Sequence, residues 1–240
     1  MNRVKKILWL GLAACLALRP APLSAAHDAA NHLLPAGLVD PQTLVPPPPA
    51  PDSFVEHTEI DVLLNLQLRR TPEQVALARK VQEENAFIFG SDVLGDWFNA
   101  ANLPRMAAFF VQVNDELTPV NHATKKLFSR RRPPFQDARI KPCVEYSDTT
   151  SYPSGHATRS AIWAGLLGAV FPDQAPAFAA RAAVTRWARL VGGAHHPTDV
   201  EAGRIIGEAV ARELLKNPAV QQILTELRAE AAPFLQKKAA

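Results

Sequence analysis

The chain has 240 residues, of which 48% are hydrophobic, enough for one sizeable core and inconsistent with a disordered protein. Its formal charge of +3 does not indicate a nucleic-acid partner, because four of the 26 Lys and Arg residues precede any acidic residue and the remainder of the chain carries 22 bases against 23 acids. Beyond the N-terminal leader, no segment supplies the ~20 uninterrupted apolar residues that a membrane span needs. We therefore expect one domain that neither binds nucleic acid nor spans a membrane.

Residues 1–26 are typical of a secretory signal peptide. A basic start precedes an apolar run over residues 7–18, and small residues follow at 24–26. This pattern predicts cleavage before His27 and a mature protein that is periplasmic or secreted.

A second interpretation of the leader involves Cys15. Residues 12–15 resemble a lipoprotein cleavage box, which would leave a lipidated Cys15 anchored to the membrane. The conventional cleavage site that follows makes lipidation the less favoured alternative. If Cys15 leaves with the signal peptide, Cys143 has no partner within the chain, and either a core thiol or an intermolecular bridge remains open.

Residues 27–52 are rich in proline and cannot form a regular helix, so we expect an extended arm. Residues 53–240 are expected to form the helical domain. Thr71, Pro72 and Gln74 are typical of a helix start and predict a helix to about Phe89. Residues 90–104 are expected to form a loop.

Apolar residues then recur at helical spacing over residues 106–117, and the helix is predicted to continue past a kink at Pro119 to about Arg131. Pro133 and Pro134 are expected to end it. Residues 135–150 lack periodicity and predict a loop.

The second half of the domain predicts four more segments. An apolar helix over residues 157–171 starts near Ser154, and a second helix over residues 178–191 stops at two glycines. A turn over residues 195–197 leads to a helix capped by Thr198.

One stripe of this last helix is apolar or small and comprises Val200, Gly203, Gly207, Val210 and Leu214. Asn217 and Pro218 end the helix, and a polar helix follows to the tail. Because no convincing strand pattern occurs, we expect an all-α single-domain bundle.

Three polar clusters lie in the domain. Lys125 and Arg132 are seven residues apart and would share one helical face, or they are members of a solvated basic run. Ser154, Gly155 and His156 place a hydroxyl, an amide and an imidazole at a helix start, which suits a phosphate, although Ser154 could be a plain N-cap.

The third cluster is Arg189, His195 and Asp199, spaced by six and four residues. Asp199 begins a helix within reach of the His195 ring, or it is only a favourable charge in the first helical turn.

Taken in order, these motifs resemble the three-part signature of the type 2 phosphatidic acid phosphatase superfamily. The chain is most similar to the secreted bacterial class A non-specific acid phosphatases, through the leader, the proline arm, residues 151–156 and residues 199–204. The resemblance spans roughly residues 46–224 and implies the helical bundle of that superfamily, whose other members include the vanadium haloperoxidases.

The resemblance implies a phosphatase that acts on phosphate monoesters of broad specificity, with transfer to alcohols also open. Lys125, Arg132, Arg189, Ser154 and Gly155 would hold the phosphate. His195 would attack phosphorus to give a phosphohistidine, Asp199 would orient it, and His156 would serve as acid and then base. Activity should peak below neutral pH.

No cofactor or metal is expected, because three fixed cations would supply the electrostatic stabilisation and no histidine shows metal-ligand spacing. A vanadium-dependent haloperoxidase and a membrane-surface lipid phosphatase are alternatives. A helical phosphate-binding protein with a dead site is a third.

His196 is expected at the pocket rim with its ring turned away from that of His195. A homo-oligomer is left open, since the Gly203 and Gly207 stripe suits close contact within or between subunits.

Overall fold

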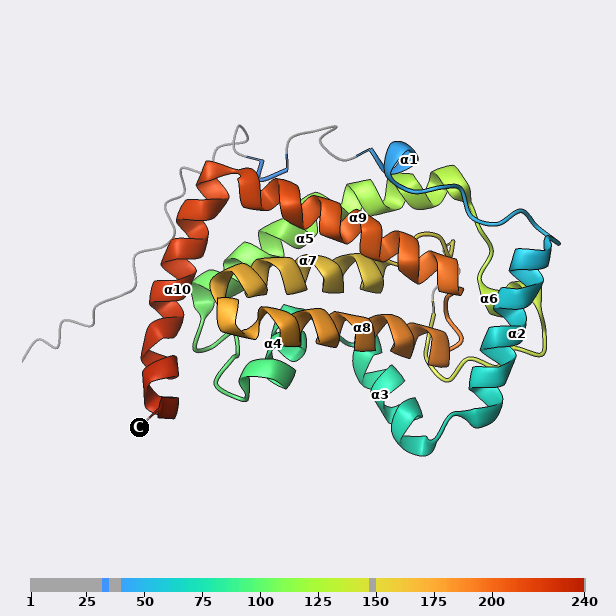
Figure 1. Ribbon diagram of the computed structural model, residues 1–240, viewed down its shortest axis with the longest axis horizontal. Coiled ribbons are helices and arrows are strands. Elements are labelled where there is room, and N and C mark those ends of the chain that lie inside the picture. The colour runs from blue at the N-terminus through green and yellow to red at the C-terminus, as the bar shows by residue number, and fades with distance from the viewer. Residues whose placement is uncertain (1–31, 35–39, 147–149, 240) are drawn as a thin grey trace, which may run out of the picture. The chain divides into compact units, whose positions relative to one another are not determined.

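The computed structural model describes residues 32–34, 40–146 and 150–239, so the predicted signal peptide and Cys15 lie outside the described residues. Every regular element in these residues is helical and none is a strand, which confirms the all-α prediction. The elements in chain order (Figure 1) are α1 (Pro41–Leu44), α2 (Phe54–Arg69), α3 (Pro72–Gln82), α4 (Ala86–Leu94), α5 (Pro104–Phe128), α6 (Pro133–Gln136), α7 (Gly155–Val170), η1 (Pro172–Gln174), α8 (Ala175–Val191), α9 (Pro197–Lys216) and α10 (Pro218–Ala239).

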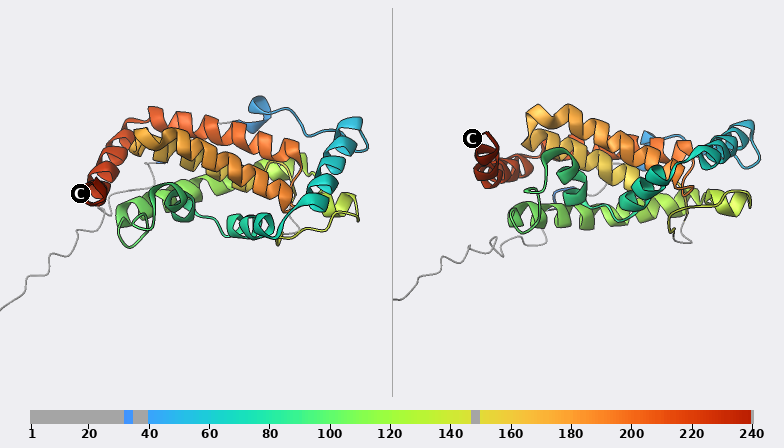
Figure 2. Two further views of the ribbon diagram at one scale, coloured as in Figure 1. Left: turned by 60° about the horizontal axis from the view of Figure 1, so that its bottom comes forward. Right: turned by 90° about the horizontal axis from the view of Figure 1, so that it is seen from below.

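Helix α7 is the centre of the core and packs against α4, α8, α9 and α10 (Figures 1 and 2). Its sequence contains no proline, and Ser154 caps its start by accepting a hydrogen bond from the Ala157 N–H at 3.4 Å. Ile162, Leu166 and Leu167 are buried in the main hydrophobic cluster. The prediction of a buried helix that starts near Ser154 is therefore confirmed.

The small residues of α9 allow it to lie close to α7. A Cβ atom on Gly203 would stand 2.5 Å from the Ser154 carbonyl oxygen, and one on Gly207 would collide with the Thr158 carbonyl oxygen. The predicted stripe is buried as expected. This close contact sets the first turns of α7 and α9 side by side, so the positive ends of two helices meet.

Replacing Gly207 with valine should lower the free energy of unfolding by about 3 kcal/mol, because the added side chain would overlap the α7 backbone and separate the two helices. Chemical denaturation would measure the loss. Arg212→Ala, on the exposed face of the same helix, is the control. Equal stability of the two variants would contradict the close contact.

The predicted helix over residues 72–89 is two helices. The capping box of Thr71 and Gln74 forms as predicted, with N–H donors 3.0 and 3.3 Å from the two side-chain oxygens. Helix α3 ends at Gln82, however, and Asn85 caps α4 by accepting two backbone hydrogen bonds. The chain breaks here because the buried Glu84 turns inward to an arginine on α8. The loop predicted over residues 90–104 is correspondingly shorter and begins at Gly95.

The proline arm is not wholly extended, because Pro41–Leu44 forms one helical turn. The arm is held by Val45, which is buried, and by the Tyr152 hydroxyl, which donates to the Pro46 carbonyl oxygen at 2.6 Å. Pro46 and the residues that follow therefore lie against the domain, close to the stretch that starts α7.

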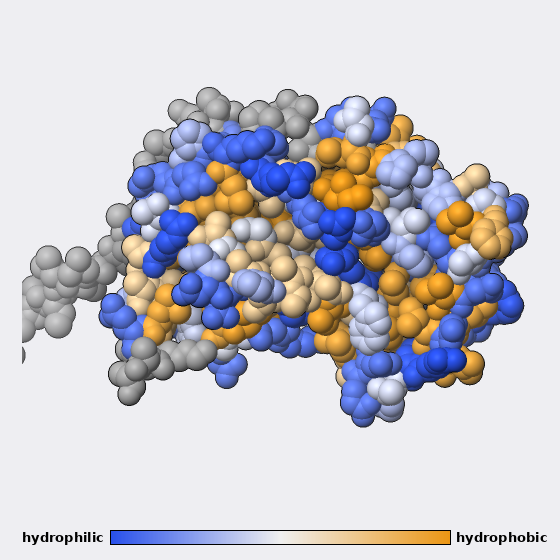
Figure 3. All heavy atoms as spheres, viewed as in Figure 1, coloured by the Kyte–Doolittle hydropathy of each residue, from blue (hydrophilic) through white to orange (hydrophobic). Residues whose placement is uncertain are grey.

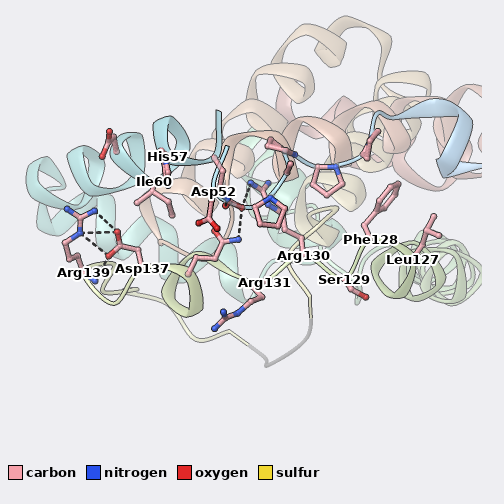
Figure 4. Close-up of a pocket in the computed structure, with 18 residues that line it drawn as sticks. Asp52, His57, Ile60, Leu127, Phe128, Ser129, Arg130, Arg131, Asp137 and Arg139 are labelled. Carbon is pink, nitrogen blue, oxygen red and sulfur yellow. Dashed lines mark hydrogen bonds and ion pairs between the residues drawn. The ribbon is translucent and has the colours of Figure 1, made fainter. Parts of the chain in front are cut away.

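A cleft of about 850 Å³ lies between the arm, α2, the end of α5 and the segment around α6 (Figure 4). Arg130, Gln136 and Glu56 line it, and Arg130 is buried whereas its neighbour Arg131 is exposed. Arg130 and Gln136, which form one wall of the cleft, also contact Asp199 and His196 respectively.

Hydrophobic residues gather on the surface over α2 (Figure 3). Phe54, Val55, Val62 and Leu68 of this helix are exposed, with Phe54 at 85% and Leu68 at 84%. A homo-oligomer stays a prediction. Within the described residues, no helix combines the length and the apolar character needed to cross a bilayer.

Candidate active site

The predicted site residues come together at one end of the bundle. Lys125 lies in the last turn of α5, Gly155 and His156 begin α7, Arg189 lies in the last turn of α8, and Asp199 lies in the first turn of α9. Four helix ends thus converge, so residues 74 positions apart in the chain can surround one small ligand.

The shared helical face predicted for Lys125 and Arg132 is wrong. Helix α5 ends at Phe128, Ser129 adopts a left-handed conformation with φ of 47°, and Arg132 is the extended residue before α6. Pro133 begins α6 instead of ending a helix. The turn still delivers the Arg132 side chain to the site, where its Nη1 donates to the Ala194 carbonyl oxygen at 2.9 Å.

His195 is buried between acidic and basic neighbours. Its Nδ1 lies 3.4 Å from Asp199 Oδ2 and its Nε2 lies 3.2 Å from Arg132 Nη1. Burial lowers the pKa of His195 to about 3, the hydrogen bond to Asp199 opposes this, and the charge of Arg132 adds to it. The ring is therefore neutral above that pH, with its proton on Nδ1 facing the carboxylate and its lone pair on Nε2. A neutral imidazole oriented in this way is suited to nucleophilic attack.

Asp199 is fully buried and ionised. Burial alone would raise its pKa, but hydrogen bonds from His195 and His196 hold the pKa well below its ordinary value. Its Oδ2 also accepts the backbone N–H of His196 at 2.8 Å. Helix α9 begins at Pro197 with Asp199 as its third residue, so the prediction that Thr198 caps this helix is wrong.

His196 does not lie at the pocket rim. It is fully buried, its Nδ1 lies 3.1 Å from the same Asp199 oxygen that His195 approaches, and its Nε2 lies 2.7 Å from Gln136 Oε1. The prediction that the two rings diverge is wrong, because the extended residue before α9 turns both rings toward one carboxylate.

Among the three predicted cations, Arg132 lowers the pKa of the other two. Burial, then the charge of Arg132, lowers the pKa of Lys125 to about 8, and burial with Arg132 lowers the pKa of Arg189 to about 10. Lys125 Nζ donates to the Thr150 carbonyl oxygen at 2.6 Å, and Arg189 Nη1 donates to Gln82 Oε1 at 2.6 Å. The buried Nε of Arg189 has no partner within the described residues. Buried cations and an orphaned donor of this kind would be stabilised by an anion.

The start of α7 presents further donors. Ser154 donates its backbone N–H to the Asp199 carbonyl oxygen at 2.9 Å, whereas the N–H groups of Gly155 and His156 have no acceptor within the described residues. Ser154 is an N-cap, as the simpler interpretation held, and its hydroxyl proton remains able to donate. Free N–H groups at a helix start bind anions.

His156 is held by one hydrogen bond. Its Nε2 lies 3.2 Å from the Gln82 carbonyl oxygen, which can only accept, so the neutral ring carries its proton there and its lone pair on Nδ1. Burial, then the charges of Arg189 and Arg159, places the pKa of His156 well below its ordinary value. The ring can therefore exchange a proton through Nδ1, most readily when negative charge is close to it.

Residues 106–221 match the model of the PAP2 superfamily, and this segment contains every predicted site residue. The chain is therefore similar to the PAP2 superfamily over just under half of its length. The non-specific acid phosphatases of Salmonella typhi and Salmonella typhimurium are 27% and 28% identical to the chain, each over 80% of both sequences. The acid phosphatase of Zymomonas mobilis is 28% identical, over 72% of this chain and 69% of its own length. These matches confirm the resemblance predicted from the three motifs.

Among solved structures, the transmembrane PAP2 type phosphatidylglycerolphosphate phosphatase of Bacillus subtilis is similar, with a TM-score of 0.48 and 20% identity. The likeness covers 68% of this chain and 85% of that chain.

One residue of this candidate site that sequence reasoning missed is Arg130. Its Nη1 donates to Asp199 Oδ1 at 2.7 Å and to Thr198 Oγ1 at 2.8 Å, and its Nη2 donates to Glu59 Oε2 at 2.6 Å. Glu59 also accepts the Thr198 N–H at 2.6 Å, which fixes the start of α9. No sequence signal distinguishes the buried Arg130 from the exposed Arg131 within the same basic run.

Ser151 is a second residue of the candidate site to which the sequence assigned no role. Its hydroxyl donates to Asp199 Oδ2 and lies 3.4 Å from His195 Nδ1. Its backbone N–H donates to the Arg130 carbonyl oxygen at 2.7 Å. Ser151 and Arg130 therefore hold the carboxylate that orients His195.

Proposed function

We propose that this chain is an acid phosphatase that hydrolyses phosphate monoesters through a phosphohistidine on His195. The observation that carries the proposal is the direction of His195 Nε2, which faces Arg132 while Nδ1 faces Asp199. The acid phosphatase relatives support the phosphatase activity in this proposal. Metal independence, broad specificity and transfer to alcohols are parts of the proposal.

In the first step, the phosphate oxygens take the place of His195 as hydrogen-bond acceptors of Arg132. Lys125 and Arg189 bind the same oxygens, together with the two free N–H groups of α7. The His195 Nε2 lone pair forms a bond to phosphorus while the bond to the ester oxygen breaks. Asp199 stabilises the positive charge that develops on the ring.

In the same step the leaving oxygen receives a proton from Nδ1 of His156. The neutral His156 then removes a proton from water, whose oxygen attacks phosphorus and breaks the bond to His195. The products are an alcohol and inorganic phosphate, and both histidines return to their starting states. The charge of the bound phosphate raises the pKa of His156, so substrate binding itself prepares the acid.

The hydrolysis of p-nitrophenyl phosphate, measured between about pH 3 and pH 9 with chelator present, tests this proposal. His156 must be protonated and its pKa in the free protein is depressed, so kcat/KM should fall as pH rises through a value below the ordinary 6.5 of histidine. His195 must be neutral to act as the nucleophile. On the acid side, the enzyme should therefore lose activity only near pH 3, where His195 becomes protonated. The descending limb of kcat should lie at higher pH, because bound phosphate raises the pKa of His156.

His156→Ala should lose that descending limb and should be impaired more on alkyl phosphates than on p-nitrophenyl phosphate, whose leaving group needs less protonation. Activity that rises steadily above about pH 8, or that chelator abolishes, would contradict the proposal.

Two alternatives have direct assays. Vanadate-dependent oxidation of halide would indicate a haloperoxidase, and activity confined to phospholipid vesicles would indicate a lipid phosphatase.

Export to the periplasm or medium remains part of our proposal, since residues 1–26 lie outside the described residues. An N-terminus at His27 in the recovered mature protein would support signal cleavage, and a lipidated Cys15 would contradict it.

A further inference from the structure

Arg159 is a fourth cation at the site that the proposed mechanism does not use. It follows His156 by three residues and Gly155 by four, so it lies one turn along the same face of α7. Its Nη1 lies 3.6 Å from the position that a Cβ atom on Gly155 would occupy, so the side chain folds back toward the start of the helix.

Asn121 faces Arg159 from the neighbouring helix. Its Nδ2 lies 3.6 Å from the same point beside Gly155, and it precedes Lys125 by one turn of α5. The Asn121 side chain is 8% exposed and has no hydrogen-bond partner within the described residues. Arg159 Nη1 and Asn121 Nδ2 therefore lie together beside Gly155 at the start of α7, and we call this pair of donors the shelf.

The shelf has positive charge without a counter-ion. Arg159 makes no hydrogen bond or ion pair within the described part of the chain, and its nitrogen atoms are not sealed from solvent, unlike the orphaned Nε of Arg189. The carboxylate whose charge acts on it is that of Glu84, which is already bound by Arg181 and Thr185. A guanidinium at the positive end of a helix is unfavourable unless an anion joins it.

The shelf lies on the leaving-group side of the site. Arg159 follows His156 by three residues of α7, so the two side chains are neighbours on one face of the helix, and the charge of Arg159 contributes to the lowered pKa of His156. Arg159 is thus placed beside the acid that protonates the departing oxygen.

We infer that Arg159 and Asn121 bind a second anionic group, a carboxylate or phosphate carried on the leaving group of the substrate. This inference rests on the proposed phosphatase function and narrows its substrate class to monoesters with a second negative charge close to the ester oxygen. The scissile phosphate occupies the residues around His195, and the second anion is held beside Gly155 by the guanidinium and the amide.

The test compares matched ligands by calorimetry in the His195→Ala background, where no turnover occurs. The pairs are 3-phosphoglycerate with glycerol 3-phosphate, for a carboxylate, and fructose 1,6-bisphosphate with fructose 6-phosphate, for a phosphate. Adding Arg159→Gln should weaken binding of the member that carries the second anionic group, in at least one pair, by roughly tenfold to a hundredfold, the range of a charge-assisted hydrogen bond. The ratio of the two affinities within that pair should fall by a similar factor.

Arg159→Lys should recover part of the preference for the ligand with the second anionic group. Asn121→Asp should reverse this preference, because it places a negative charge on the shelf. Arg212→Gln, which removes an exposed arginine of α9, is the control and should leave the ratio unchanged. Because Arg159 is repelled by its neighbours, Arg159→Gln should not lower the melting temperature of the ligand-free protein.

Equal loss of affinity for both members of each pair, or no loss, would overturn the inference. Hydrolysis of glycerol 3-phosphate by the protein with His195 intact tests the phosphatase function separately. If the protein hydrolyses no ester but still prefers the ligand with the second anionic group, and that preference depends on Arg159, the phosphatase function would be contradicted and the inferred anion-binding role of the shelf would stand. Hydrolysis without that preference would contradict the shelf alone.

Discussion

His195→Ala should lower phosphomonoesterase activity by about 10⁴-fold or more, because the substitution removes the only group that could form the bond to phosphorus in the proposed mechanism. His195 is buried against Asp199 and Arg132, so no neighbouring side chain can take its place without rearrangement. Steady-state hydrolysis of p-nitrophenyl phosphate at acid pH would measure the loss.

A labelling experiment separates the nucleophile from a merely structural histidine. Protein quenched during turnover of a labelled phosphate ester should carry phosphate that is stable in base and released in acid, as expected for a phosphorus–nitrogen bond. His195→Ala should carry none. His57→Ala, which changes an exposed histidine of α2, is the control and should retain both label and activity. Persistent label in His195→Ala would assign the nucleophile to another residue.

Arg130→Met should lower the free energy of unfolding by about 3–5 kcal/mol, because it would leave two buried carboxylates without their cation. Arg130 Nη1 lies 2.7 Å from Asp199 Oδ1 and Nη2 lies 2.6 Å from Glu59 Oε2, and both acids are almost fully buried. Denaturant titration would measure the loss of stability. Activity should fall as well, since Asp199 would no longer hold His195.

Arg131→Met is a matched control at the adjacent position. Arg131 has the same side chain but is exposed, so its substitution should change stability by no more than about 0.5 kcal/mol. A double variant, Arg130→Met with Glu59→Leu, should be more stable than Arg130→Met alone, because it removes one of the unpaired charges. Equal behaviour of Arg130→Met and Arg131→Met would mean that the buried ion network contributes little.

Local sequence determined much of the helical framework. The apolar, proline-free run after Ser154 produced α7, the capping box at Thr71 and Gln74 started α3, and the glycines of α9 became its contact with α7. These features depend on neighbours within a few residues, where periodicity and capping chemistry decide the conformation. The same local rules failed where a distant residue intervened, as when Glu84 turned toward α8 and ended the helix before Phe89.

The candidate site likewise has features that the sequence alone determined and features that only the tertiary structure determined. The order and types of Lys125, Arg132, His156, Arg189 and His195 were sufficient to predict a phosphate site, because their resemblance to a family does not depend on knowing how the chain folds.

The partners of these residues depend on contacts across 44 to 71 positions of the chain, such as Ser151 with His195 and Arg130 with Glu59. Only the tertiary structure could show that Arg130 is buried and Arg131 exposed, that both histidines share Asp199, and that Arg159 lies beside Gly155 without a hydrogen-bond partner among the described residues. A residue's charge is written in its sequence, whereas its burial and its partner are properties of the folded chain.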